Sequence, residues 1–80
     1  MPRPKVLSGP DVVRIFAAFG FEIASQRGSH VKLRREISGT RQTLTIPNHR
    51  ELDRGTLLAI YRQASRYISE GDLAPYFFNN

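Results

Sequence analysis

The feature that most constrains the fold is a change of hydrophobic period at Gly20. Before Gly20 the apolar residues recur at helical spacing, and after it they alternate with polar residues as in a strand. Glycine readily adopts the left-handed conformation that ends a helix, so Gly20 is the expected boundary. Ser8 and Asp11 occupy the two positions of a capping box, and Pro10 suits a first helical turn. The sequence therefore predicts a helix over about residues 9–19.

Three short segments of alternating polarity follow this helix. They cover residues 21–26, 30–35 and 42–46, with turns expected at 27–29 and 38–40 and a stop at Pro47. Asp53 then caps a second helix, whose apolar residues are Leu57, Leu58, Ile60, Tyr61 and Ala64. This order predicts an α+β fold, with a three-stranded antiparallel sheet covered on one face by two helices.

The ends of the chain are expected to be less regular. Residues 1–7 contain two prolines and read as an extended lead-in, while residues 69–80 form a short C-terminal extension. Ser69 and Asp72 repeat the helix-start signal, and a short helical piece follows, although Pro75 weakens it. We expect one domain over residues 1–80, because 80 residues leave no room for two cores.

The apolar pattern also predicts the strand register, because a slip by one residue would turn every side chain over. Pairing Val31 with Ile46 and Leu33 with Leu44 keeps all four side chains on the covered face. Placing Phe21 and Ile23 on that face as well requires a three-residue turn over 27–29, with Gly28 in the unusual backbone conformation. The uncovered face then carries Gln26, His30, Lys32, Arg34, Thr43 and Thr45.

Composition points to an anionic partner. The chain has 12 Lys and Arg against 7 Asp and Glu, and ten of those twelve bases are arginine. Arginine suits bidentate phosphate contacts, so nucleic acid is favoured over a membrane surface. No apolar run approaches the length of a membrane span, and no signal-type segment follows the basic N-terminus. With no cysteine, thiol chemistry and Cys-based zinc sites are excluded, and a cytoplasmic protein is expected.

His30 is the candidate catalytic residue. An imidazole exchanges protons near neutral pH, and beside Lys32 and Arg34 it could take the proton of a ribose 2′-hydroxyl while the cations hold the phosphate. RNA supplies that internal nucleophile, so such cleavage needs no metal and no cofactor. The alternative is an ordinary solvated sheet face with an inert surface histidine.

Two further positions carry similar alternatives. His49 could be a second proton carrier or a phosphate donor, or it could simply order its loop, the interpretation we favour. Arg54 and the free amides at the start of the second helix could bind a phosphate. A zinc site at His30 and His49 is disfavoured, because it would need a third protein ligand.

The order and spacing of four segments resemble the HicA family of small toxins from HicA–HicB toxin–antitoxin modules. These segments are Gly20-Phe21, Arg27-Gly28-Ser29-His30, Ile46-Pro47-Asn48-His49 and Gly55-Thr56-Leu57. The resemblance covers about residues 6–68 and implies a fold similar to a double-stranded-RNA-binding domain. It implies an mRNA interferase whose catalytic histidine is His30, with Gly28 and Ser29 shaping the turn that presents it. The partner implied is a HicB-like antitoxin.

The sequence thus predicts a metal-independent endoribonuclease that cleaves mRNA, with an RNA-binding surface around the catalytic His30. The residues expected to bind RNA are Gly28, Ser29, Lys32, Arg34, His49 and Arg54. Two alternatives remain: a non-catalytic RNA-binding module of the same fold, and an interaction protein that contacts only its antitoxin.

Overall fold

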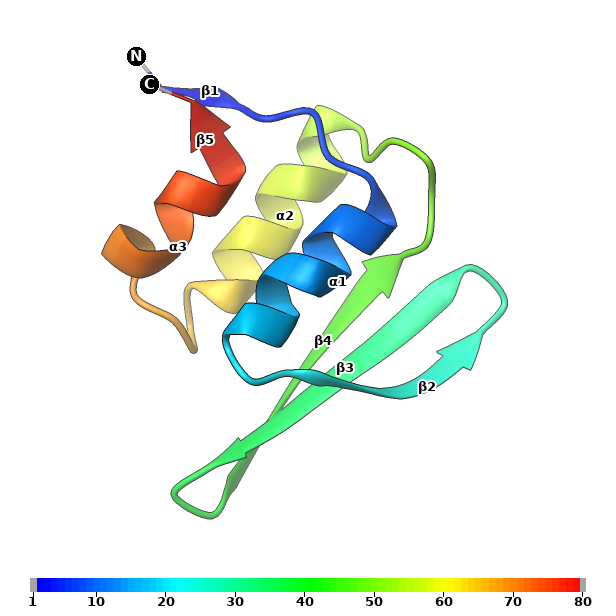
Figure 1. The fold of residues 1–80 in the computed structure, drawn as a ribbon, viewed down its shortest axis with the longest axis vertical. Helices are drawn as coiled ribbons and strands as arrows, with labels where there is room; N and C mark the ends of the chain where they lie inside the picture. The colour runs from blue at the N-terminus through cyan, green and yellow to red at the C-terminus, as the bar shows by residue number, and fades with distance from the viewer. Residues whose placement is uncertain (1, 80) are drawn as a thin grey trace.

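A computed structural model describes residues 2–79 and places the sheet and its two covering helices in the order predicted from the sequence (Figure 1). The sheet is antiparallel, with strand order β2-β3-β4. The elements that build this unit are α1 (Gly9–Ala18), β2 (Glu22–Arg27), β3 (His30–Ile37), β4 (Thr40–Pro47) and α2 (Arg54–Ala64). The α+β fold class, similar to a double-stranded-RNA-binding domain, is therefore confirmed.

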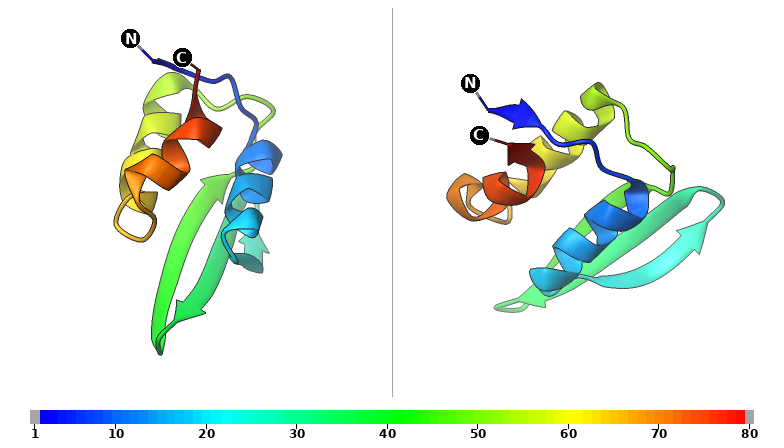
Figure 2. Two further views of the ribbon diagram at one scale, coloured as in Figure 1. Left: turned by 60° about the vertical axis from the view of Figure 1, so that its left-hand side comes forward. Right: turned by 45° about the horizontal axis from the view of Figure 1, so that its top comes forward.

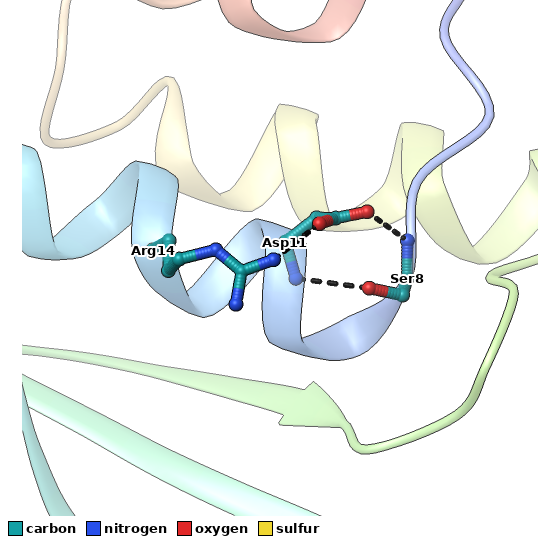
Figure 3. A network of polar contacts seen from close by, with 3 residues as sticks. All are labelled: Ser8, Asp11 and Arg14. Atoms are coloured by element: carbon teal, nitrogen blue, oxygen red, sulfur yellow. Dashed lines mark hydrogen bonds and ion pairs between the residues drawn. The ribbon is translucent and has the colours of Figure 1, made fainter.

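Helix α1 begins and ends for the reasons seen in its sequence. The Asp11 amide donates to the Ser8 hydroxyl, and the Ser8 amide donates to the Asp11 carboxylate, so both halves of the capping box are formed (Figure 3). Arg14 adds an exposed ion pair to the same carboxylate. At the other end Gly20 has a φ of 92°, a left-handed conformation that glycine adopts without strain.

The core lies between the inner face of the sheet and the helices. Val31 pairs with Ile46 and Leu33 with Leu44, as the alternation predicted. These four side chains are buried together with apolar side chains of the helices, chiefly Val12, Phe16, Leu57 and Ile60. Since alternate residues of a strand face opposite sides, burying these positions turns His30, Lys32 and Arg34 to the other face.

The pairing of β2 with β3 differs from the prediction. The turn between them has two residues, Gly28 and Ser29, and Arg27 pairs with His30. The additional residue that we expected in the turn lies instead in the strand, where the register shifts between Ile23 and Ser25. Such a bulge lets the strand change register without lengthening the turn. Gly28 does carry the positive φ, at 58°.

The predicted face of Gln26 is wrong as a result, and the predicted burial of Ile23 is wrong for a separate reason. Gln26 pairs with Val31 and so belongs to the inner side of the sheet, not to the uncovered face. Ile23 does pair with Leu33 on the inner side, yet it is 60% exposed. The two helices approach β4 most closely, and every residue of the edge strand β2 is exposed. Facing the inner side therefore does not bury a residue of β2.

The two ends of the chain pair with each other. The lead-in forms β1 (Arg3–Pro4), and the extension forms α3 (Glu70–Phe77) and β5 (Phe78–Asn79), which is antiparallel to β1 (Figure 2). Helix α3 continues through Pro75 and ends two residues later. Phe77 is buried against the rings of Phe16 and Tyr61, which fixes α3 to the other helices. None of the helices in residues 2–79 is long and apolar enough to cross a membrane.

Candidate functional site

The outer face of the sheet, defined here as the side that the helices leave uncovered, carries an exposed row of basic side chains. On β3 it presents His30, Lys32 and Arg34, which pair across β4 with Pro47, Thr45 and Thr43. This is the register that the sequence predicted. The structure therefore brings His30, Lys32 and Arg34 together on one open surface, with hydroxyl side chains beside the two cations.

A tight turn presents His30 at the start of β3. Gly28 has the positive φ that the first central position of a type II′ hairpin turn requires, and Ser29 follows it. A side chain at Gly28 would meet no steric obstacle, so the requirement there is one of backbone conformation alone. His30 is thereby held between Arg27 on β2 and Pro47 on β4.

Backbone hydrogen bonds connect the loop after β4 to this turn and to the start of α1. The Asn48 amide donates to the Ser29 carbonyl at 2.5 Å, and the Gly9 amide donates to the His49 carbonyl at 2.8 Å. Gly9 is buried, and a Cβ atom at that position would collide with the Pro47 carbonyl oxygen. The absence of a side chain at Gly9 allows α1 to approach the loop this closely.

His49 and Arg54 lie in surroundings different from that of His30. His49 lines a shallow pocket beside the start of α1, with Ser8 and Pro10. Arg54 is the first residue of α2 and lines another pocket, together with Arg3 and Lys5 of the N-terminal segment. The six residues predicted to bind RNA thus divide into four on the turn and strand that carry His30, and two, His49 and Arg54, that line separate pockets.

Sequence reasoning missed Arg27 as a neighbour of His30. Arg27 was assigned to the turn, but it is the last residue of β2, and its side chain shares the outer face with that of its partner His30. A signal was available, because a Gly-Ser pair between two alternating segments is typical of a two-residue hairpin turn. The longer turn follows only if Ile23 is placed on the buried face.

Arg35, next to Arg34, has a structural role. Its guanidinium donates to the Gln42 side-chain oxygen at 2.6 Å and to the backbone carbonyls of Phe19 and Tyr67 at 2.7 and 3.0 Å. It also lies 4.8 Å from the centre of the Phe21 ring, within the range of a cation–π contact. Partial burial lowers the pKa of Arg35 below its usual value. The Arg35 guanidinium therefore links the chain just after α1 and just after α2 to the sheet.

Within the described part of the chain, no group of three or more His, Asp or Glu side chains is arranged to hold a metal ion. The two histidines accordingly have no third ligand there of the kind that a zinc site requires.

Comparison with known proteins identifies the family. The family described as "HicA toxin of bacterial toxin-antitoxin" matches residues 9–65, which is more than half of the chain and includes the whole sheet with both covering helices. The chain therefore belongs to the HicA toxin family of bacterial toxin–antitoxin systems. No curated protein and no solved structure matches the chain significantly.

Proposed function

We propose that this HicA family member is a metal-independent endoribonuclease that cleaves mRNA in the cytoplasm, with His30 as the catalytic base. The observation that carries the proposal is the position of His30, whose exposed imidazole lies on an open sheet face among unburied cations. Membership of a toxin family agrees with an activity that arrests growth.

The reaction is an internal phosphoryl transfer. His30 takes the proton of a ribose 2′-hydroxyl, and that oxygen attacks the adjacent phosphorus. The bond from phosphorus to the 5′-oxygen of the next nucleotide breaks, and the departing oxygen takes a proton from water. The protonated His30 then gives its proton to the hydroxide that remains, which regenerates the imidazole. The products are a 2′,3′-cyclic phosphate and a 5′-hydroxyl end, with no oxidant or cofactor consumed.

RNA is held mainly through its phosphates in this proposal. Lys32 and Arg34 contact the backbone along β3, while Gly28 and Ser29 let it approach the turn before His30. His49 and Arg54 bind the RNA from outside the strands, at the loop after β4 and the start of α2. No Phe, Tyr or Trp side chain lies on the outer face, so stacking of bases on such rings contributes little there.

The direct test replaces His30 and follows cleavage of a defined RNA. His30→Ala should lower the cleavage rate by about 10² to 10⁴-fold, the range that a general base contributes, without changing thermal unfolding. His49→Ala is the matched control, and it should alter RNA affinity more than rate. Equal cleavage by the wild type and His30→Ala would remove His30 from the mechanism.

Three further measurements test the chemistry and the phosphate contacts. A substrate with one 2′-deoxynucleotide at the cleaved position should resist cleavage there, because the nucleophile is missing. EDTA should leave the rate unchanged, and a rate abolished by EDTA would contradict the metal-independent reaction. The affinity for single-stranded RNA should fall with salt, with a logarithmic slope of about −0.7 per phosphate contacted.

The alternative is a non-catalytic RNA-binding module of the same fold. It has the same basic outer face and predicts the same salt dependence, but no cleavage of any RNA by the wild type. Ribonuclease-free protein that binds RNA and leaves it intact would favour this alternative.

The proposed partner is a HicB-like antitoxin protein. Toxin and antitoxin genes lie side by side, so an open reading frame next to this one should encode a HicB-like chain. Co-expression of that chain should restore growth and co-purify with the toxin. A neighbouring product that neither binds nor neutralises the toxin would contradict this assignment.

A further inference from the structure

Arg27 is the cation that the strand register places directly opposite His30. The two residues close the β2–β3 hairpin on either side of the Gly28-Ser29 turn. Directly paired residues of an antiparallel sheet have their Cβ atoms about 4.5 to 5.5 Å apart on the same face. The imidazole of His30 and the guanidinium of Arg27 therefore start from neighbouring points on the outer face.

The other cations of the outer face are farther from His30. Consecutive residues of a strand advance by about 3.3 Å, so Lys32 is about 7 Å along β3 from His30 and Arg34 about 13 Å. Arg41 is at the opposite end of the sheet, where it pairs with Glu36 at 3.9 Å. Only the β2 neighbour Arg27 shares a cross-strand pair with the histidine among the cations of residues 2–79.

Within residues 2–79, the Arg27 side chain also makes no polar contact of the kind that would stabilise the fold. It makes no hydrogen bond or ion pair there, and it is exposed. Arg14 and Arg35, by contrast, donate to oxygens of the protein. An unoccupied guanidinium has all its donors available, and its planar fork matches the geometry of two phosphate oxygens.

We propose that Arg27 binds the phosphate at which RNA is cleaved and stabilises the negative charge that grows on its two non-bridging oxygens. The inference rests on the proposed ribonuclease function and assigns the second group in that reaction. Arg27 supplies hydrogen-bond donors and positive charge, while His30 takes the 2′-hydroxyl proton. Donors aimed at charge that develops in the transition state act on the rate, whereas Lys32 and Arg34 hold neighbouring phosphates in ground and transition states alike.

Single-turnover cleavage of a short RNA, measured over a range of enzyme concentrations, separates rate from affinity. Arg27→Ala should lower the maximal rate by about 10² to 10³-fold, the cost of removing one transition-state donor, and change the half-saturating concentration little. Arg27→Lys keeps the charge without the fork and should recover part of the rate. Arg34→Ala, the matched control on the same face, should weaken half-saturation several-fold at an unchanged maximal rate.

Thermal unfolding of each variant accompanies the kinetics, since an exposed edge residue should leave stability unchanged. An Arg27→Ala variant that only weakens half-saturation, as Arg34→Ala does, overturns the assignment and leaves the ribonuclease proposal intact. A wild-type protein that does not cleave, or a His30→Ala variant that cleaves normally, overturns the ribonuclease proposal and this one with it. The two failures are thus distinguishable.

Discussion

Two adjacent arginines of β3, Arg34 and Arg35, show how differently the two faces of the sheet use the same side chain. Arg35 faces the helices, where its guanidinium donates to three oxygens and lies over the Phe21 ring. Arg34 faces the other way, between Glu22 and Thr43, and is exposed. The guanidinium of the inner arginine is engaged in hydrogen bonds within the protein. The guanidinium of the outer arginine remains available to a ligand.

The same difference holds for the first half of β3. Val31 and Leu33 are buried on the inner face, whereas His30 and Lys32 are exposed on the outer one. Stability therefore depends on alternate residues of β3, and the proposed chemistry depends on the residues between them. Substitutions in the two sets should therefore separate folding from function.

The largest expected effect is on the inner face. Leu33→Ala removes a side chain that is 1% exposed and leaves a cavity, so the free energy of unfolding should fall by about 2 to 5 kcal/mol. Lys32→Ala, one residue away on the outer face, should change it by less than about 0.5 kcal/mol. Urea denaturation measures both, and similar losses in the two variants would contradict the assignment of faces.

The arginine pair gives the next largest effect. Arg35→Ala leaves the carbonyls of Phe19 and Tyr67 without their donor, so the free energy of unfolding should fall by about 2 to 3 kcal/mol. Arg34→Ala should leave stability unchanged and weaken RNA binding. Denaturation and an RNA-binding titration on both variants check this, and a destabilised Arg34→Ala variant would show that the outer arginine also supports the fold.

Much of this fold was predictable from local patterns. The alternation through Val31, Leu33, Leu44 and Ile46 fixed the β3–β4 register, because burying four apolar side chains leaves one solution. The helix starts followed from residues that satisfy free backbone amides, such as Ser8 and Asp53. The family resemblance, carried by short motifs in order, is confirmed by the match over residues 9–65.

The failures came from interactions that no local pattern specifies. The β2 bulge depends on how an edge strand meets the rest of the sheet, so the partner of His30 was missed. The β1–β5 pair joins residues from opposite ends of the chain and contains only two partners on each strand. The role of Arg35 depends on oxygens of Phe19 and Tyr67, which are far away in the sequence. The assignments of His30 and the RNA-binding residues stay predictions.

Substitutions at two glycines, Gly9 and Gly71, test whether the contact between α1 and the loop after β4 helps to position His30. Gly9→Ala forces a methyl group against the Pro47 carbonyl, so it should cost about 1 to 3 kcal/mol of stability and shift the loop that bonds to Ser29. Gly71→Ala meets no atom within 4 Å and lies in α3, so it should be neutral or slightly stabilising. Unfolding and cleavage assays on both variants would show whether the loop positions His30, and a Gly9→Ala variant with wild-type stability would contradict the steric argument.

The smallest effect is at the capping box of α1, on the helix side. Ser8→Ala removes the acceptor of the Asp11 amide and should lower the free energy of unfolding by about 1 kcal/mol without changing RNA cleavage. Hydrogen bonds from the Ser8 amide and hydroxyl, with help from Arg14, lower the pKa of Asp11 below its usual value. The folded chain therefore favours the ionised carboxylate.

The sign of the pH dependence follows from that lowered pKa. The contribution of Asp11 is present in full above its unfolded pKa, about 3.9, and disappears as the pH falls through the lower folded value. Asp11→Asn should thus be less stable than the wild type at pH 7, and the gap should close as the solution is acidified. Chemical denaturation at several pH values between 7 and 2 measures it. A gap that stays constant over this range would mean that the carboxylate's charge adds nothing, and that the cap acts only through its neutral hydrogen bonds.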